Sequence, residues 1–484
     1  MQTLFAWLLT GFHYTTAYPW AAWLVTRSPR QDSAWLPPLV SLAVSAGGLS
    51  LVMFWQSMLG IPFSTAGITL TYAALMLPGA VLWWKSTRTL PPTPPRTQGG
   101  ERWNLLALFL LLLISAAILF NAVYWPFSRA DAVGIYHRYG QQMAETRAIV
   151  PLPGAGTLYE AYPILMPLQY TYAYLASGWI NEYLARLTPA LLSLGCLPAV
   201  YALGRMLHSA AAGWLGALLL ALTPAFGTWA SSGYVDLPMA FFYTLAAAFA
   251  WRMWAGGHWG DALLAGGMVG LAAWTKNAGL IGVGLLVLWL LWALAQRRIG
   301  WGQVALTLSA CAFIAAPWYA RNLLQANLLL PDTAWTDDAQ HTLDTLLIFI
   351  TRPNIYGVTG LLVLASVALS VGYAGRRWRE AAADLLLLLW TVPFFGAWWL
   401  FANYDPRFVL LFWPLLCVLA AKWTLALWQR VPQTARRRLA VPLVLVALGL
   451  ALLAVWESVE YKDNILRDPL MDDATKHEVV FSER

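Results

Sequence analysis

The sequence predicts an all-α integral membrane protein that crosses the bilayer many times. Hydrophobic residues make up 60% of the 484 residues, charged residues make up 11%, and the mean hydropathy is +0.58. Soluble globular domains do not have this balance. In addition, about fourteen apolar stretches come close to the ~20 residues that an α-helix needs to cross a bilayer.

The expected spans are 4–25, 34–56, 63–84, 104–124, 186–207, 209–230, 237–254, 260–275, 278–296, 302–320, 355–375, 382–402, 408–428 and 438–457. The first span has no basic start and no small-residue cleavage site, so we expect it to be retained rather than removed as a signal peptide. Cys196, Cys311 and Cys417 all lie inside spans and lack metal-ligand spacing, which argues against disulfides and a cysteine metal site.

The distribution of charge predicts the orientation. With the N-terminus outside, alternation of the spans puts 18 basic and 5 acidic residues in the cytoplasm, a net charge of +13, against −6 on the other face. Short basic loops stay on the cytoplasmic side of membrane proteins. The overall charge of +7 therefore reflects topology, and no nucleic-acid partner is expected.

The chain divides into four regions by composition. We expect an N-terminal three-helix membrane segment (1–85), a cytoplasmic Pro/Gly-rich linker (86–103), a membrane module (104–457) and a polar external tail (458–484).

Two long external loops, 125–185 and 321–354, contrast with short inner loops, so the function is expected at the external face. In the first loop, Ala132–Ala148 has the spacing of a helix that lies along the membrane surface. The aromatic stretch Gln169–Trp179 fits the lipid headgroup zone, where Tyr and Trp are enriched.

Two acidic residues stand at the outer ends of spans. Asp131 opens the first external loop, and Asp236 lies in SSGYVDLPMAFF. Each also has a purely structural explanation. Ser128-Arg-Ala-Asp131 fits a helix-capping pattern, and Asp236 can cap a helix whose first turn contains Pro238. The local sequence leaves both alternatives open.

Three basic residues also lie on the outer side, close to the apolar boundary. Lys276 is in WTKNAGL, Arg321 in APWYARN and Arg407 in NYDPRFVLLFWP. Snorkelling explains Lys276 equally well, and Asp405 can simply pair with Arg407. Further candidates for substrate contact come from the first loop, although a surface position explains the two charged ones as well: Tyr136, Arg138 and Glu160.

Together these residues put one or two carboxylates and several cations at the same membrane surface. This set suits the breaking of a bond to a lipid-linked phosphate while an acceptor hydroxyl loses its proton. The cations hold and neutralise the phosphate leaving group. A carboxylate within hydrogen-bond reach of the acceptor acts as the base, an effect typically worth roughly 10²–10⁴-fold.

At these residues the chain resembles the GT-C superfamily of polyprenyl-phosphate-sugar-dependent glycosyltransferases. It is most similar to the bacterial relatives of dolichyl-phosphate-mannose protein mannosyltransferases and to the lipid A aminoarabinose transferases. The matching segments cover roughly 104–425 in the family's order: RADAVGIYHRYGQQMAE, YEAYPILMPLQY, EYLARLTPALLSLGCLPAVYALGR, LTPAFGTWASSGYVDLPMAFF, WTKNAGL, PWYARN and YDPRFVLLFWP.

The resemblance implies a GT-C-type fold with a long first external loop, and it implies roles for single residues. Asp131 would be the general base of an inverting displacement at the anomeric carbon. Lys276 and Arg407 would bind the carrier phosphate, and Arg321 is a weaker candidate for that role. Asp236 would shape the acceptor or sugar site.

The implied partners are a polyprenyl-phosphate-linked sugar donor, an acceptor lipid, glycan or protein, and membrane lipids. The implied location is the cytoplasmic membrane, with the active site on the extracytoplasmic side. The implied process is the glycosylation of the cell envelope. Many family members carry a second acid directly after the first, whereas this chain has Ala132. The absence of this second acid argues against a mechanism that uses two paired carboxylates. No definite cofactor is expected, and the sequence leaves open whether a divalent cation takes part.

Two other classes of function compete with a transferase. A transporter or flippase of a lipid-linked sugar would place ionisable residues near the bilayer midplane and is often built from repeated halves; here the charges lie at span ends and no repeat is visible. A scaffold in envelope assembly would need none of the external acids and bases. The transferase hypothesis requires that Asp131, Lys276 and Arg407 line one outward-facing cavity. A separation above about 15–20 Å would exclude it, because the groups must meet one sugar-phosphate.

Overall fold

The computed structural model describes residues 2–26, 35–87, 101–150, 161–327, 329–330 and 338–482, which form helices and connecting turns without a strand. Apolar segments become helices because lipid offers the backbone no hydrogen-bond partner, so each N–H and C=O must be satisfied within the segment. The predicted all-α, multi-pass architecture is therefore confirmed.

The N-terminal segment has four helices where the sequence predicted three. They are α1 (Gln2–Thr16), α2 (Tyr18–Thr26), α3 (Leu36–Met58) and α4 (Thr65–Thr87). The expected span 4–25 is interrupted at Ala17, just before Pro19. Proline lacks an N–H and its ring clashes with the carbonyl four residues earlier, so it fits best in a first helical turn, which here is that of α2.

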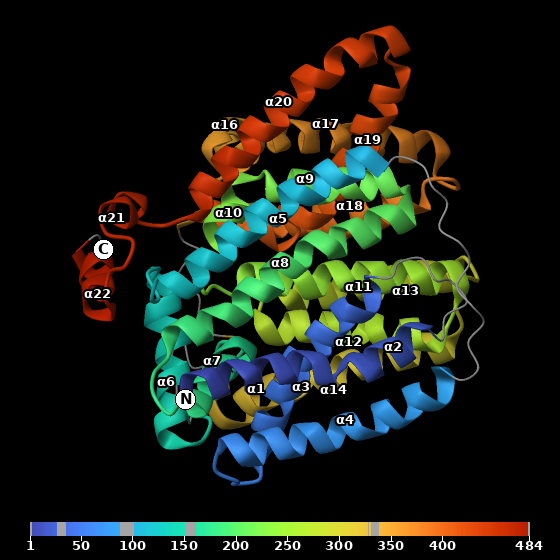
Figure 1. The fold of residues 1–484 in the computed structure, drawn as a ribbon. Helices are drawn as coiled ribbons and strands as arrows, with labels where there is room; N and C mark the ends of the chain where they lie inside the picture. The colour runs from blue at the N-terminus through green and yellow to red at the C-terminus, as the bar shows by residue number, and fades with distance from the viewer. Residues whose placement is uncertain are drawn as a thin grey trace.

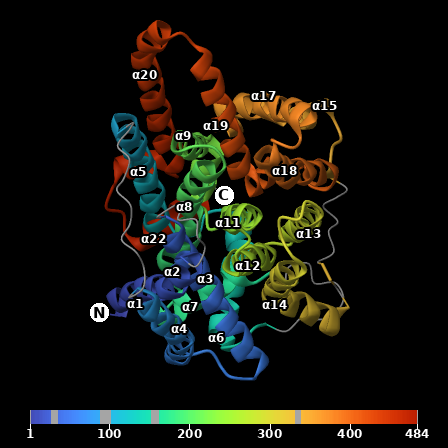
Figure 2. The same cartoon turned by 90° about the vertical axis from the view of Figure 1, so that its right-hand side faces the viewer.

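Twelve helices make up the body of the membrane module. They are α5 (Glu101–Tyr124), α8 (Glu182–Leu207), α9 (Ala210–Ala221), α10 (Pro224–Ala230), α11 (Asp236–Gly256), α12 (Trp259–Thr275), α13 (Gly279–Ala295), α14 (Trp301–Ala326), α17 (Pro353–Arg377), α18 (Ala382–Phe401), α19 (Trp413–Arg430) and α20 (Gln433–Ser458). The long helices run side by side in Figure 1, and α11 and α12 are seen nearly end-on in the turned view of Figure 2.

The predicted number of fourteen spans is not confirmed. Among the described residues, eight helices are long and apolar enough to cross a membrane. A ninth span results if α9 and α10 count as one. The sequence predicted one span over 209–230, but α9 and α10 are bent by 69° where Pro224 starts the second helix.

In its described residues, the loop predicted to be the first external one contains a π-helical turn η1 (Ala132–His137), α6 (Arg138–Thr146) and α7 (Leu165–Ser177). The expected helix over 132–148 is present. However, Tyr170, Tyr172 and Tyr174 on α7 are buried in protein instead of facing lipid headgroups. Each hydroxyl has a protein partner; that of Tyr170, for example, donates to the Gly233 carbonyl oxygen at 2.7 Å.

Short helices complete the chain. They are α15 (Leu343–Leu346), α16 (Ile348–Thr351), the 3-10 helix η3 (Pro406–Leu411), α21 (Lys462–Arg467) and α22 (Asp473–Ser482). Both chain termini, α6, α21 and α22 lie at the same end of the bundle (Figure 1).

The N-terminal helices and the membrane module share one continuous core of buried apolar residues. Polar contacts between α3 and α7 reinforce it. The Ser50 hydroxyl donates to the Leu165 carbonyl at 3.0 Å, and the Gln169 amide donates to the Ala46 carbonyl at 2.8 Å. The N-terminal segment is therefore packed against the first external loop of the module.

Candidate functional site

The guanidinium of Arg407 is the centre of the candidate site. Arg407 lies in η3, where the Asp405 carboxylate accepts its backbone N–H at 2.8 Å and so caps the short helix. The side chain is buried, and its Nη2 lies 2.8 Å from Asp131 Oδ2 and 2.9 Å from Asp405 Oδ2. Its Nε lies 3.6 Å from Asp236 Oδ2. One cation thus contacts three carboxylates.

Asp131 uses its carboxylate for this ion pair and not as a helix cap. Its side chain makes no capping hydrogen bond to η1. The hydroxyl of Ser128, the expected cap partner, donates to Glu460 instead. The Asp131 backbone N–H donates to the Tyr234 hydroxyl at 3.1 Å, which ties the loop to the segment before α11. The capping alternative for Asp131 is therefore wrong.

Asp236 and Lys276 form a second ion pair in the same place. Asp236 is the first residue of α11, and Pro238 lies in the first turn as expected, but the helix has no side-chain cap. The Lys276 ammonium, at the end of α12, donates to Asp236 Oδ1. The same ammonium lies 3.7 Å from the centre of the Phe408 ring. Lys276 therefore turns to a buried carboxylate, which replaces the snorkelling alternative.

Aromatic rings surround the Arg407 guanidinium. Its central carbon lies 4.2 Å from the centre of the Tyr234 ring, 5.3 Å from that of Trp229 and 5.0 Å from that of Phe408. Trp229 and Tyr234 are stacked, with an interplanar angle of 11°. Such walls exclude water and strengthen both cation–π and ionic contacts.

Opposing effects set the protonation of this group of charges. Burial alone would lower the pKa of Arg407, but Asp236, Asp405 and Asp131 together raise it above its usual value. Burial raises the pKa of Asp405, against the lowering effect of Arg407. We call Asp131, Asp236, Asp405, Lys276 and Arg407 the Arg407 cluster. With three acids and two bases, it carries one excess negative charge when all are ionised.

The remaining predicted residues are distributed around the cluster or away from it. Tyr136 is buried next to it: burial, and then the charges of Asp236 and Asp131, raise the pKa of its phenol well above the usual value. Arg138 is exposed on α6. Glu160 lies outside the described residues.

Arg321 is separate from the Arg407 cluster in all contacts of the described residues. Its guanidinium donates to the Val150 carbonyl at 2.8 Å and to the Asn322 side chain at 3.3 Å, and it lies over the Trp318 ring. Arg321 lies inside α14, five residues before its end at Ala326, and α14 directs it to a different part of the first loop.

The sequence analysis missed several members of the site. It treated Asp405 only as a partner of Arg407, and it did not identify Trp229, Tyr234 or Phe408. Tyr234 and Phe408 each lie within two residues of a predicted site residue, a signal that was available. The approach of Trp229 depends on the turn between α10 and α11, which no local pattern predicts.

A metal centre is not apparent in the described part of the chain, where no group of three His, Cys, Asp or Glu side chains could hold an ion.

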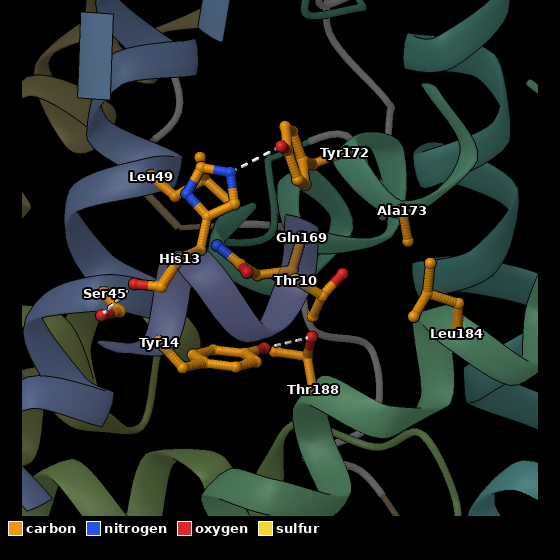
Figure 3. A pocket seen from close by; sticks show the side chains of 10 residues that line it. All are labelled: Thr10, His13, Tyr14, Ser45, Leu49, Gln169, Tyr172, Ala173, Leu184 and Thr188. Carbon is orange, nitrogen blue, oxygen red and sulfur yellow. Dashed lines mark hydrogen bonds between the residues drawn. The ribbon is translucent and has the colours of Figure 1, made fainter. Parts of the chain in front are cut away.

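A separate polar cavity lies between α1, α3, α7 and α8 (Figure 3). There His13 contacts the Tyr172 hydroxyl at 2.5 Å, and the hydroxyls of Tyr14 and Thr188 lie 2.6 Å apart.

Comparisons with known proteins agree with the predicted resemblance. Residues 154–320 match the family model of dolichyl-phosphate-mannose-protein mannosyltransferases. This range contains Asp236 and Lys276 of the Arg407 cluster but neither Asp131 nor Arg407. No curated protein sequence matches the chain.

Two solved structures have a similar fold. One is ArnT from Cupriavidus metallidurans bound to undecaprenyl phosphate, with a TM-score of 0.52 and 20% identity, over 72% of this chain and 64% of that chain. The other is the oligosaccharyltransferase AglB from Archaeoglobus fulgidus in complex with an inhibitory peptide and a dolichol-phosphate, with a TM-score of 0.50 and 15% identity, over 74% and 56%. This chain spans less than two thirds of the length of either protein. The GT-C-type fold is confirmed.

Proposed function

We propose that this GT-C-type membrane protein is a glycosyltransferase that moves a sugar from a polyprenyl-phosphate-linked donor to an acceptor at the outer face of the membrane. The fold and the family match support a transferase of this class, and the two similar structures contain polyprenyl phosphates. The observation that carries the proposal is the Arg407 cluster, where cations suited to a phosphate adjoin a carboxylate suited to a base.

Asp131 is the base in this proposal because an acceptor can reach it. Its side chain is 38% exposed, against 28% for Asp405 and 3% for Asp236. The acceptor oxygen attacks the anomeric carbon while its proton passes to Asp131. The bond from that carbon to the phosphate oxygen breaks, with inversion, and the electron pair leaves with the polyprenyl phosphate.

Lys276 and Arg407 stabilise this leaving group. In the structure both cations are bound to carboxylates, so the donor phosphate must replace at least one of these contacts. When the phosphate binds Arg407, it replaces the Asp131 carboxylate, which is then free to accept the proton of the acceptor. Charge-assisted hydrogen bonds to the developing phosphate charge are the largest contribution expected here.

Two features of the substrates follow from the placement of the site. The polyprenyl tail enters from the bilayer between helices, because the cluster lies at helix ends. The acceptor, a lipid, a glycan or a protein, approaches from the extracytoplasmic side, the side that the charge distribution predicts for the first loop. Asp236, fixed between Lys276 and Arg407, shapes the sugar site.

The test uses membranes that contain the protein and a panel of radiolabelled polyprenyl-phosphate sugars. We expect the wild type to release label from the carrier and Asp131→Asn to lower this rate at least 10²-fold. The matched control is Asp344→Asn. Among the described residues, Asp344 forms an exposed ion pair with Arg352 at 3.2 Å and makes no contact with the Arg407 cluster, so this variant should behave as wild type.

The same experiment separates transfer from transport. Label that crosses the membrane while still attached to its carrier, equally in wild type and Asp131→Asn, would identify a transporter and overturn the transferase. Transfer at the wild-type rate by Asp131→Asn would leave the enzyme class intact but remove Asp131 as the base.

A further inference from the structure

The C-terminal tail reaches back to the segment that carries Asp131. Just after α20, the Glu460 carboxylate accepts hydrogen bonds from the Ser128 hydroxyl at 3.0 Å and from Arg129 Nε at 2.8 Å. The Trp125 indole donates to the Glu460 carbonyl at 3.0 Å. Glu460 thus binds Ser128 and Arg129 through its side chain and Trp125 through its backbone, all within the six residues before Asp131.

Arg186 extends this contact into the bundle. Its guanidinium, 0% exposed, lies 3.3 Å from Glu460 Oε2 and donates to the carbonyls of Trp125, Pro126 and Ser231. In the contacts of the described residues, Glu460 is the carboxylate that balances this buried charge. Burial raises the pKa of Glu460, but Arg186 and then Arg129 lower it below its usual value, so the carboxylate stays ionised.

The contacts continue from this point to the Arg407 cluster by two routes. Through the backbone, Ser231 leads to Tyr234, whose hydroxyl accepts the Asp131 N–H. Through side chains, Arg129 lies over the Trp229 ring at 5.2 Å, and Arg407 lies over the same ring at 5.3 Å. Both routes begin at groups that Glu460 or Arg186 holds.

We propose that Glu460 is a positioning residue, which acts through Ser128, Arg129 and Arg186 to hold the Asp131 carboxylate against Arg407. The proposal rests on the proposed function, because it concerns the base of that reaction. The Glu460 carboxylate is 8% exposed and accepts from both the Ser128–Arg129 segment and Arg186 on α8, so it ties the segment before Asp131 to the helix bundle. Small displacements of catalytic groups lower rates strongly.

The direct test is Glu460→Gln, which keeps the shape and removes the charge. We expect kcat to fall about 10–100-fold with little change in the donor KM. A merely structural role would lower the amount of folded protein and leave kcat per folded molecule and the donor KM unchanged.

Ser128→Ala guards against a failure to fold, since loss of the Glu460 charge leaves Arg186 buried without a counter-ion. This variant breaks the link to the Asp131 segment and leaves the Arg186–Glu460 pair. We expect a fall in kcat of about threefold to tenfold, the size of a typical net hydrogen bond, again with little change in the donor KM. The control is Ser482→Ala, which removes an exposed tail hydroxyl that donates to the Val479 carbonyl within α22 at 3.0 Å; it should match the wild type.

The outcomes separate this proposal from the proposed function. An active Asp131→Asn variant would overturn the function itself. An inactive Asp131→Asn variant, together with an unchanged kcat in Ser128→Ala and in folded Glu460→Gln, would overturn the positioning role alone. If Glu460→Gln does not fold, Ser128→Ala decides by the same criterion.

Discussion

At the scale of single residues, the geometry of the Arg407 side chain matters as much as its charge. A guanidinium has donors in a planar fork and can bind several carboxylates at once, whereas an ammonium is a compact point charge. Arg407 contacts Asp131, Asp236 and Asp405 from Nη2 and Nε. This arrangement fixes the relative positions of three acids that would otherwise repel one another.

We therefore expect Arg407→Lys to lower the transfer rate about 10–100-fold, since a lysine cannot hold all three carboxylates in place. Arg407→Met should be worse and should also lower thermal stability, because the three carboxylates then have only Lys276 to offset their charge. Initial rates and thermal unfolding in detergent measure both effects. Arg352→Lys, at an exposed ion pair, is the control. Wild-type activity in Arg407→Lys would contradict the role of the fork.

The sequence predicted the charged members of this site better than its walls. The structure joins Asp131, Asp236, Lys276 and Arg407 in one chain of ion pairs. The outward-facing cavity that the transferase hypothesis required, and the catalytic roles of these residues, stay predictions. Ionisable residues at the outer ends of spans are rare enough to be recognised one by one. Trp229 could not be recognised in this way, because tryptophans are common along the whole chain.

At the scale of elements, close packing of α12 against α14 sets the place of Lys276. A Cβ atom at Gly266 of α12 would lie 1.9 Å from the Thr307 carbonyl oxygen of α14, so the two backbones meet there. Small residues allow such contacts between helices in membranes. At the next residue, Gly267, a Cβ would meet only Ile314 Cδ1, at an ordinary 3.7 Å.

Gly266→Ala should therefore lower the free energy of unfolding by about 1–3 kcal/mol, because the helices must move apart. Gly267→Ala, its neighbour on the same helix, should be neutral or slightly stabilising, since alanine favours a helix by up to about 1 kcal/mol over glycine. Denaturant titrations of both variants in detergent check this. Equal stabilities would mean that α12 and α14 are not closely packed.

Prolines and aromatic residues limited the prediction of the elements. The apolar pattern predicted most spans, but it read through Pro19 and Pro224, where the chain bends or restarts. The tyrosines of α7 were assigned to the headgroup zone because amphipathic aromatics fit either a membrane interface or a buried network. Only the partners of their hydroxyls distinguish these, and those partners are distant in sequence.

At the scale of the whole molecule, the C-terminal tail is bound to the start of α8 by a titratable contact. His477 on α22 lies 3.3 Å from Glu182 Oε1. The hydrogen bond to Glu182 raises the pKa of His477 from 6.5 to about 9. Because the folded pKa exceeds the unfolded one, the contact contributes fully below pH 6.5 and is lost as the pH rises through about 9.

We expect hydrogen exchange in α22 to accelerate as the pH rises from 7 to 10, beyond the intrinsic increase, which exposed peptides in the same sample calibrate. His477→Gln should abolish this extra step, because its side chain does not titrate. His341→Gln, at an exposed histidine that contacts the Leu400 carbonyl, should retain it. A pH-independent protection of α22 in the wild type would contradict the role of His477.

The overall arrangement was predicted only in part. The charge asymmetry predicted which loops share a side, and the structure places α6 and the tail helices at one end of the bundle (Figure 1); which side of the membrane this end faces stays a prediction. The docking of the tail was not predicted. Its contacts join residues such as Ser128 and Glu460, which are 332 positions apart, and no local pattern reports such pairs.

The same separation has a consequence for biosynthesis. Asp131 leaves the ribosome early, whereas Glu460 is translated only after all the long helices. A growing chain can insert its helices one after another, yet the segment before Asp131 lacks its counterpart until α20 has crossed the bilayer. Catalytic competence would then arrive as the last event of assembly, so that an unfinished chain in the membrane would not consume its lipid-linked donor.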